Sequence, residues 1–424
     1  MSAGPGPAAE VDVAVVGAGL AGLRCARVLA DAGLHVEVLE AADRVGGRMR
    51  TDEVDGHLLD RGFQLLNPAY PAVRRWVDVP ALGLQPFPAG VAAATERGTV
   101  RLGDPRRAPG LLAPSALTGA RRLREVVPLL RWVAPLLRPR AQGLAERLRA
   151  TRPTRSLRAA LDDLGARGDL RRVLEAFLSG VVLDREGATD ERVALLLVRS
   201  FLDGSPSLPA GGMQALPAQL AQDLTVHLDT PVEVLEPGGL RTAAGSVRAR
   251  AVVVATDQLA SATLLDRAPG TDRGVVTHWW SAEVGSLPAT GGLLHVDARP
   301  RPTGPVANTA VVSQAAPSYS PDGRALVQAS VVLDHRGVVP EATVRRHAAE
   351  LLGTSAAGWQ ELARHEVPHA LPSATPPHDL RRPTRVRPGL HVCGDHRDTP
   401  SIQGALVSGD RAARAVLAEL RAAR

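Results

Sequence analysis

The sequence predicts an α/β protein of two domains, a Rossmann-like domain and a second domain that combines an antiparallel sheet with a helical insertion. Three observations predict this architecture. Residues 11–40 have the pattern of a strand, a glycine-rich turn, a helix and a second strand. Residues 111–202 are rich in Leu, Ala, Arg and Glu at helical spacing. Residues 275–335 alternate as strands do, between many turn-forming residues.

The N-terminal unit begins with an apolar, β-branched run at residues 11–16, which is typical of a buried parallel strand. Residues 20–32 are expected to form a helix that ends at Gly33, and residues 35–40 form the second strand. The first ten residues are rich in Gly, Pro and Ala, so we expect a short leader without the apolar core of a signal peptide.

Further along the chain, helices punctuated by prolines are expected over residues 111–202. A Gly-Gly turn opens another helix within residues 208–224, and residues 247–255 form a strand that is buried at its C-terminal end. The last segment contains a strand at residues 390–393, a loop and a helix from Gln403 onward.

The composition excludes several mechanisms and partners. All 50 Lys and Arg residues are Arg, so the chain has no P-loop lysine, no Schiff-base lysine and no lysine general base. The two cysteines, Cys25 and Cys393, are too few for a disulfide framework, and a cytoplasmic location is expected. Aromatic residues are only 3% of the chain, too few for base stacking, so no nucleic-acid partner is expected. No apolar run reaches the roughly 18–20 residues of a membrane span.

The strongest functional signal follows the first strand and reads Gly17-Ala18-Gly19-Leu20-Ala21-Gly22. Gly17 permits the tight turn, Gly19 lets a pyrophosphate approach the backbone, and Gly22 lets the helix pack closely on the strand. The free N–H groups at the helix start favour an anion. Glu40, at the end of the second strand, can accept hydrogen bonds from both ribose hydroxyls of an adenosine and would repel a 2′-phosphate. The segment therefore predicts a dinucleotide site that disfavours NADP; a purely structural glycine turn is the alternative.

The residues from Glu40 onward resemble a loop of the flavin-containing amine oxidase and phytoene desaturase superfamily, which includes protoporphyrinogen oxidase-like proteins. The matching stretch is Glu40-Ala41-Ala42-Asp43-Arg44-Val45-Gly46-Gly47-Arg48. In that superfamily a Gly-Gly-Arg loop closes over the flavin diphosphate, so the resemblance implies FAD contacts from this stretch. Leu59-Asp60-Arg61-Gly62-Phe63-Gln64 resembles the next family segment, which implies that Gly62, Phe63 and Gln64 run along the flavin.

The end of the chain resembles the second cofactor segment of the same family. The matching stretches are Cys393-Gly394-Asp395, Ser401-Ile402-Gln403-Gly404-Ala405 and Ser408-Gly409. The resemblance implies that Asp395 holds ribityl hydroxyls and that the last helix begins at the flavin pyrimidine edge, where its N-terminus would stabilise the charge of reduced flavin. Val232, after Pro231, matches a small strand whose backbone contacts adenine. The contacts implied in this second segment come from Gly394, Asp395, Ile402, Gln403, Gly404 and Ala405.

The resemblance also divides the chain. Residues 1–75, 205–260 and 385–424 are expected to form a discontinuous FAD-binding domain, and residues 76–204 and 261–384 the substrate domain with its helical insertion. The predicted fold class is therefore α/β, a two-domain flavoprotein with a Rossmann-like FAD-binding domain and a substrate domain of antiparallel sheet plus helical insertion.

The expected activity is that of an FAD-dependent oxidoreductase. It would oxidise a largely apolar small molecule by hydride transfer from C–H to flavin N5, as desaturases and dehydrogenases do. This chemistry needs placement and desolvation more than an acid or base, so no catalytic side chain is assigned. Amine-oxidising members keep a lysine near N5 and an aromatic cage, and this chain has no lysine and only Tyr70 and Tyr319 as tyrosines. An amine oxidase-type flavoprotein without the lysine and a non-catalytic flavin-binding protein that assembles with a partner are the alternatives.

FAD is expected to be bound non-covalently. Some members tether the flavin through a cysteine upstream of the last cofactor segment, whereas Cys393 lies inside the predicted strand itself. Cys25, on the first helix, is interpreted as a small core residue.

Basic residues are concentrated between Arg101 and Arg158, a stretch that holds 14 Arg and three acidic residues. Within it, residues 117–148 interleave seven Arg with paired apolar residues and Trp132, as an interfacial helix does. The sequence therefore predicts peripheral contact with a membrane surface that brings the enzyme to its hydrophobic substrate, although three prolines break the stretch. The alternative is a solvated Arg-rich face whose apolar side covers the core of the substrate domain.

Three further patterns each have a structural explanation. His365-Glu366-Val367-Pro368-His369 fits the HExxH pattern of zinc proteases, but Pro368 disfavours the helix that this pattern needs, so no metal site is expected. Trp279 and Trp280 are adjacent on a strand and point to opposite faces, so at most one could line a pocket. For His396 and Arg397, an approach to the flavin and an ordinary loop role are both open.

Overall fold

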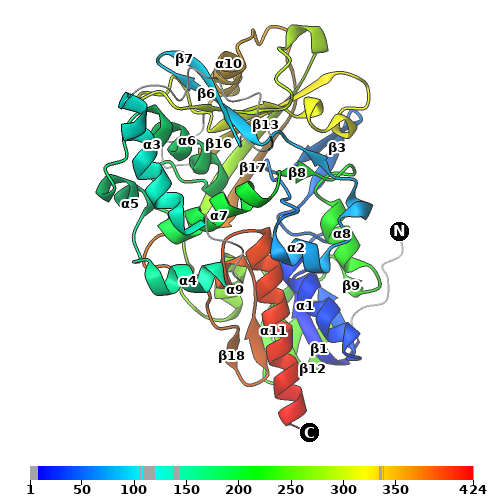
Figure 1. Ribbon diagram of the computed structural model, residues 1–424. Helices are drawn as coiled ribbons and strands as arrows, with labels where there is room; N and C mark the ends of the chain where they lie inside the picture. The colour runs from blue at the N-terminus through cyan, green and yellow to red at the C-terminus, as the bar shows by residue number, and fades with distance from the viewer. Residues whose placement is uncertain are drawn as a thin grey trace.

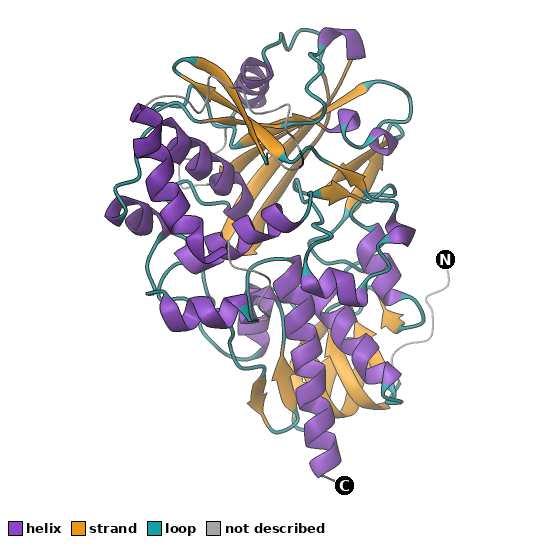
Figure 2. Cartoon of the chain, viewed as in Figure 1, coloured by secondary structure: helices purple, strands orange, loops and turns teal. Residues whose placement is uncertain are grey.

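A computed structural model describes residues 8–104, 107, 120–136, 143–333, 337 and 339–423 of the chain. An eight-stranded sheet lies at one end of the molecule and a seven-stranded sheet at the other, with the helical insertion beside them (Figure 1). Helices cover the front of the first sheet and gather along one side of the second (Figure 2). The predicted α/β class with two sheet-based units is confirmed.

The first sheet has the strand order β10-β11-β12-β1-β2-β9, and β19 adds to β12 and pairs with β18. Its strands are β1 (Glu10–Val16), β2 (Val36–Leu39), β9 (Thr225–His227), β10 (Val232–Glu236), β11 (Gly239–Thr242), β12 (Gly245–Val254), β18 (Arg385–Arg387) and β19 (Leu390–Val392). Strands β9, β2, β1, β12 and β19 are parallel neighbours. Their carboxyl ends therefore meet at one edge, where open α/β sheets bind ligands.

Three helices pack together against this sheet: α1 (Leu20–Asp31), α8 (Ala215–Ala221) and α11 (Ile402–Ala422). The contact between α1 and α11 is close because Gly409 has no side chain: a Cβ there would overlap the carbonyl oxygen of Ala21. Cys25 and Cys393 are fully buried in the shared core beneath these helices. The predicted βαβ opening and C-terminal helix are thus confirmed.

The second sheet has the order β17-β13-β16-β15-β14-β6-β7. Its strands are β6 (Gly90–Thr95), β7 (Gly98–Gly103), β13 (Asp272–Ala282), β14 (Leu294–Asp297), β15 (Asn308–Val311), β16 (Ala325–Leu333) and β17 (Gln360–Pro372). The predicted antiparallel sheet near residues 275–335 is confirmed, but it is larger than predicted. The β6–β7 hairpin joins it through a parallel pairing of β6 with β14, and β17 extends the other edge. Helix α10 (Glu341–Leu352) packs on β14, β15 and β16.

The described part of the insertion is helical, as predicted, with α3 (Ala120–Val133), α4 (Leu144–Thr151), α5 (Leu157–Asp163), α6 (Asp169–Val182) and α7 (Glu191–Asp203). These helices have a core of their own in which Trp132 is fully buried. Helix α6 also packs against β6, β14 and β16, so it joins the insertion to the second sheet.

The remaining elements connect the two units. They are β3 (Thr51–Val54), β4 (His57–Asp60), α2 (Pro71–Trp76), β5 (Gln85–Pro86), β8 (Ser207–Leu208) and α9 (Gln258–Leu264), with short 3₁₀ turns that include η7 (Pro317–Tyr319) and η8 (Asp395–Arg397). Within the described residues, no helix has the length and apolar character needed to span a membrane.

Candidate functional site

The three glycines of the first turn have different surroundings. Gly17 has a φ of +104°, and a Cβ there would press on the backbone of Ala255 at 3.1 Å. A Cβ on Gly22 would overlap the carbonyl oxygen of Gly17. A Cβ on Gly19, which precedes α1, would have no neighbour within 4 Å. Gly17 and Gly22 therefore serve packing, whereas Gly19 leaves open space where the helix begins, as a bound pyrophosphate requires.

The second glycine loop lies directly against the first. The backbone N–H of Gly46 donates to the carbonyl of Ala18 at 2.8 Å, and Gly19 and Gly46 form an isolated parallel bridge. Gly46 and Gly47 both have positive φ values, of +119° and +58°. A Cβ on Gly47 would lie 3.5 Å from the α-carbon of Gly19. The backbones of the two loops thus come together at the start of α1, as the resemblance implies for a diphosphate cradle.

Glu40 connects these loops. Its carboxylate is buried and accepts hydrogen bonds from the N–H of Ala18 at 2.6 Å and of Ala42 at 3.0 Å. The adjacent Ala41 is exposed. The Glu40 carbonyl accepts from the N–H of Thr230 at 2.8 Å, just before Val232 at the start of β10. Glu40 thus fixes the shape of the first turn, and its contact with a ribose stays a prediction, as do the adenine contact of Val232 and the contact of Ala41.

Arg48 and Asp395 form an ion pair of 2.6 Å between Nη2 and Oδ1, although 347 residues separate them. Arg48 Nη1 also donates to the carbonyl of Ala370 at 2.9 Å. Both side chains line the large cavity of the protein, as does Gly394. The structure therefore brings together the two predicted cofactor segments from opposite ends of the chain.

Gly62, Phe63 and Gln64 lie on the cavity wall, as the resemblance implies. Gln64 donates from Nε2 to the carbonyl of Arg48 at 2.8 Å. The Phe63 ring meets that of Phe87 edge to face, with centroids 5.8 Å apart. This segment therefore holds the Gly-Gly-Arg loop through the hydrogen bond from Gln64 to Arg48, and it presents an aromatic ring to the cavity.

The start of α11 differs in part from what the resemblance implies. Ile402 and Ala405 line the cavity, together with the N-cap Ser401. Gln403 is turned away, because its Oε1 accepts from the N–H of Ala72 at 2.9 Å. A Cβ on Gly404 would overlap the carbonyl oxygen of Thr399, so this glycine serves packing of the preceding loop. Neither Gln403 nor Gly404 lines the cavity.

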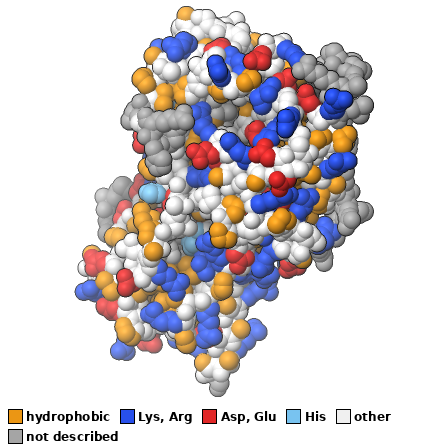
Figure 3. Space-filling model, turned by 90° about the vertical axis from the view of Figure 1, so that its left-hand side faces the viewer, with side chains coloured by type: hydrophobic (Ala, Val, Ile, Leu, Met, Phe, Trp, Pro, Cys, Tyr) orange, Lys and Arg blue, Asp and Glu red, His pale blue; other side chains and the backbone are white. Residues whose placement is uncertain are grey.

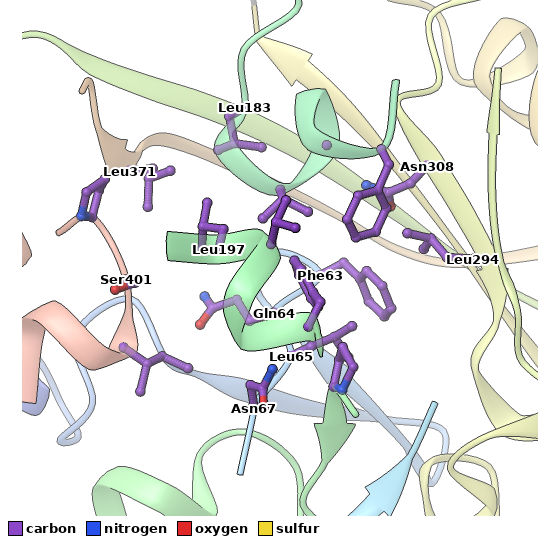
Figure 4. A pocket seen from close by; sticks show the side chains of 18 of the residues that line it. Phe63, Gln64, Leu65, Asn67, Leu183, Leu197, Leu294, Asn308, Leu371 and Ser401 are labelled. Atoms are coloured by element: carbon purple, nitrogen blue, oxygen red, sulfur yellow. The ribbon is translucent and has the colours of Figure 1, made fainter. Parts of the chain in front are cut away.

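The cavity has a volume of about 1360 Å³ and extends from these loops into the insertion. Figure 4 shows Ser401 and Leu371 at one end and Leu294 and Asn308 at the other, with Phe63 between them. The arm within the insertion is lined mainly by apolar side chains from α3, α6 and α7, namely Leu129, Leu130, Val133, Leu170, Val173, Leu174, Phe177, Val181, Leu197, Val198, Phe201 and Leu202. This arm is suited to an apolar molecule.

The charged side chains of the lining are already engaged. Its four arginines have carboxylate partners, in the pairs Arg48–Asp395 (2.6 Å), Arg61–Asp52 (2.7 Å), Arg107–Asp104 (3.2 Å) and Arg199–Asp203 (2.7 Å). Asp257 caps α9 by accepting from the N–H of Ala260 at 2.8 Å. The titratable groups of the described lining include no His, Glu or Cys. Burial raises the pKa of Tyr70, also on the wall, to about 12.

Several lining residues were not predicted. Residues 255–257 follow β12 at the carboxyl edge of the sheet, and that position alone could have identified them. Asn308 and Ser330 lie on the second sheet and carry no sequence signal of their own.

Asp60, behind the lining, accepts hydrogen bonds from Thr51 Oγ1, Met213 N and Tyr319 Oη, and burial raises its pKa to about 6.

The HExxH pattern lies on a strand and not on the helix that a zinc protease site needs. His365 and His369 lie on strand β17, where His365 faces Asp52 and His369 faces Asp272. Within the described residues no His, Cys, Asp and Glu side chains cluster as metal ligands.

Trp279 and Trp280 are both fully buried and belong to different cores, on opposite faces of the sheet. His396 and Arg397 do not line the cavity. Arg397 donates to the carbonyl of Pro383, and burial lowers the pKa of His396 to about 4.

Comparison with known proteins agrees with this geometry. Residues 20–417 match the family model described as flavin containing amine oxidoreductase. A putrescine oxidase from Kocuria rosea is 50% identical over 80 residues, 19% of this chain and 16% of that protein. A chloroplastic protoporphyrinogen oxidase from Nicotiana tabacum is 42% identical over 73 residues, 17% of this chain and 13% of that protein. The matches to these curated relatives thus span less than a fifth of their length. A solved structure of wild-type putrescine oxidase bound to putrescine has the same fold, with a TM-score of 0.66, 21% identity, and coverage of 96% of this chain and 99% of that one.

Proposed function

Because the chain belongs to the flavin-containing amine oxidoreductase family and is an FAD-dependent oxidoreductase, we propose that its substrate is a largely apolar small molecule oxidised at a C–H bond. Family membership favours an enzyme over a flavin-binding protein without turnover. The proposal concerns the substrate class and the site that receives it.

The residues present fit FAD. The open space beside Gly19 and the adjoining Gly46-Gly47 loop can accept a diphosphate, and Arg48 supplies a guanidinium beside it. Ser401 and Ile402 would place the N-terminus of α11 at the ring system. When bound, FAD supplies a hydride acceptor. The protein's own contribution is then to orient a substrate against it and to exclude water.

The observation that carries the proposal is the apolar arm of the cavity. A hydride donor in this arm would be held mainly among Leu, Val and Phe side chains, and the charged side chains of α7 on the lining, Arg199 and Asp203, are paired with each other. An ammonium group would need an aromatic cage or an unpaired carboxylate. Each carboxylate of the lining is already paired or caps a helix, and of the two tyrosines only Tyr70 is on the lining, because Tyr319 is fully buried against Asp60. These features favour an uncharged, desaturase-like or dehydrogenase-like substrate.

An amine remains the second candidate, since the relatives and solved structures include putrescine oxidase. Anaerobic mixing of the yellow holoenzyme with polyenes, lipids, porphyrinogens and amines separates the two by which compound bleaches the flavin. We expect bleaching by an uncharged compound and none by putrescine. Bleaching by amines alone would overturn the apolar-substrate proposal.

We also propose that the insertion contacts a membrane surface that holds the substrate. On α3, Val127 and Leu130 are 37% and 52% exposed, and Leu130 also lines the cavity. Trp132, on the same helix, is buried in the insertion core, as the alternative of a solvated face expects. Figure 3 shows Arg, acidic and hydrophobic side chains interspersed over this side of the molecule. Arg138 and Arg140 of the basic stretch lie outside the described residues.

A further inference from the structure

A row of polar side chains crosses the inner face of the second sheet, on the wall of the otherwise apolar cavity. Thr277 on β13 is paired with Ser330 on β16, and Ser330 is paired with Asn308 on β15. Directly paired residues of antiparallel strands lie on the same face, and so does Gln328, two residues before Ser330. All four residues are at most 6% exposed. Ser330 and Asn308 line the cavity, and Figure 4 shows Asn308 on its wall.

A series of hydrogen bonds connects these side chains from Thr277 to Asn308. Thr277 Oγ1 lies 3.5 Å from Ser330 Oγ, and Ser330 Oγ donates to Gln328 Oε1 at 3.3 Å. Gln328 Nε2 then donates to Asn308 Oδ1 at 3.2 Å. Each bond fixes the orientation of the next amide, so the acceptor atom of the Asn308 side chain is already used. Its Nδ2, which carries two N–H donors, is the last atom of this series of hydrogen-bonded side chains.

The opposite wall leaves room for this amide. Helix α6 passes over Asn308 at Gly180, and a Cβ on Gly180 would overlap Asn308 Nδ2. Gly180 also lines the cavity. Among the described residues, no protein acceptor is assigned to Nδ2, which lies at the cavity wall beside Gly180. A substrate atom can supply the missing acceptor.

Asn67, also on the lining, provides a contrast. Its Nδ2 donates to the carbonyl of Ser200 at 2.8 Å, and its Oδ1 accepts from the N–H of Ala69 at 2.9 Å. Its amide is therefore used within the protein. The same residue type thus has a structural role at position 67 and a donor directed at the cavity at position 308.

We propose that Asn308, oriented by Gln328 and Ser330 and accommodated by Gly180, is a specificity residue that donates a hydrogen bond to a neutral acceptor on the substrate. This inference rests on the proposed apolar substrate and refines it. The substrate carries a carbonyl or ether oxygen at the position that reaches β15, and the rest of the substrate is apolar. A carbonyl oxygen there would fix the substrate along the cavity and so select which C–H bond faces the cofactor loops.

The test measures binding without turnover. Equilibrium dialysis of the holoenzyme gives dissociation constants for 4-phenylcyclohexanone and for cyclohexylbenzene, which have the same carbon skeleton and differ by the ketone oxygen. In Asn308→Leu, we expect ketone binding to weaken roughly five- to tenfold relative to hydrocarbon binding, the effect of one lost hydrogen bond. Gly180→Ala should cause a similar relative loss by displacing the amide, while Ser179→Ala on the same helix should cause none. Flavin content and melting temperature show that each variant is folded.

Two results would overturn the inference. An unchanged ketone-to-hydrocarbon ratio in folded Asn308→Leu and Gly180→Ala would show that the amide contacts no ligand. Selective loss of 4-phenylcyclohexanol binding with no change for the ketone would show that position 308 presents an acceptor instead. Because the dialysis needs no oxidation, a failure of the proposed function would appear separately, as the absence of flavin bleaching by any uncharged compound.

Discussion

The hydroxyl of Tyr319 donates a hydrogen bond of 2.8 Å to the carboxylate of Asp60, and this contact joins the two sheet-based units of the protein. Asp60 ends β4 and belongs to the predicted flavin segment, whereas Tyr319 lies in η7, between two strands of the second sheet. Thr51 Oγ1 and the N–H of Met213 donate to the same carboxyl group. Three donors on one buried carboxyl thus hold the cofactor loop and the substrate sheet in register.

Asp60 should make the stability of the protein depend on pH. Burial raises its pKa from 3.8 to about 6, so between about pH 4 and pH 6 the folded chain retains a proton that the unfolded chain loses. The contribution of this group to the free energy of unfolding therefore falls as pH rises through that window, by about 3 kcal/mol. Asp60→Asn should remove this dependence in urea unfolding of the apoprotein at several pH values.

Asp52→Asn is the matched control for the pH series. Burial is the largest single effect on Asp52 and raises its pKa, but the hydrogen bond with Arg61 and the charges of Arg61, His365 and Arg44 together outweigh it, so the pKa of the carboxyl is lowered. Asp52 is therefore already ionised across most of the window, and because its charge adds to the raised pKa of Asp60, Asp52→Asn should reduce the slope without removing it. An Asp60→Asn variant with the wild-type slope would contradict the assignment.

Glu40→Gln should weaken FAD binding by about 1.5–3 kcal/mol, because a charged acceptor is lost beside the diphosphate turn. The carboxylate that holds Ala18 and Ala42 would become an amide with only one acceptor atom. Fluorescence titration of the apoprotein with FAD measures the change. Glu37→Gln is the control, since this buried carboxylate on β2 contacts Ala8 and His227 instead. Equal affinity for FAD in Glu40→Gln and wild type would reduce Glu40 to a structural role.

Alanine substitution of the glycines of the site should have two kinds of effect, one on FAD affinity and one on the stability of the apoprotein. Gly19→Ala should lower FAD affinity with little change in the melting temperature of the apoprotein, because its methyl group would enter open space. Gly404→Ala should instead lower the apoprotein melting temperature, because its methyl group would overlap Thr399. Thermal melts with and without FAD distinguish these effects. A destabilised Gly19→Ala apoprotein would show that the space beside α1 is needed by the fold itself.

FAD should be released by denaturation. Both cysteines are fully buried in the core, and a hydrogen bond with Cys393 together with burial raises the pKa of the Cys25 thiol. A protonated, enclosed thiol is a poor nucleophile toward a flavin. Acid precipitation should therefore leave the yellow colour in the supernatant, and colour in the pellet would reveal a covalent link.

Membrane contact can be tested with vesicles. The holoenzyme should co-sediment with anionic vesicles at low salt and less at high salt, since arginines near an anionic surface contribute about 1 kcal/mol each. Leu130→Ser should reduce binding, whereas Leu259→Ser, which changes an exposed leucine on α9, should not. Equal sedimentation with neutral and anionic vesicles at low salt would leave the basic stretch as a solvated face.

The cofactor half of the site could be predicted from sequence because its signals are local. The turn at Gly17–Gly22 needs backbone freedom that few residues offer, and Glu40 ends a strand whose direction the βαβ pattern sets. The orientation of Gln403 could not be predicted, because it depends on the N–H of Ala72, which the fold places beside α11. A match of residue types carries no information about such a contact.

The substrate half could be predicted only in outline. Alternation near residues 275–335 indicated strands, but the pairing of β6 with β14 joins segments about 200 residues apart. The polar row at Asn308 exists only through cross-strand register, since Thr277, Ser330 and Asn308 come from three separate strands. Asp60 is similar, because burial is the main cause of its raised pKa and burial depends on the final packing.

The ion pair between Arg48 and Asp395 also bears on how the protein is made. The first sheet is incomplete until β19 has joined β12, and α1 lacks its partner helix until α11 has been synthesised. A nascent chain on the ribosome therefore holds the Gly17–Gly22 turn without the segment that faces it until residues 390–422 have been made. Contacts between such distant segments form slowly, so the cofactor cradle is completed late in folding.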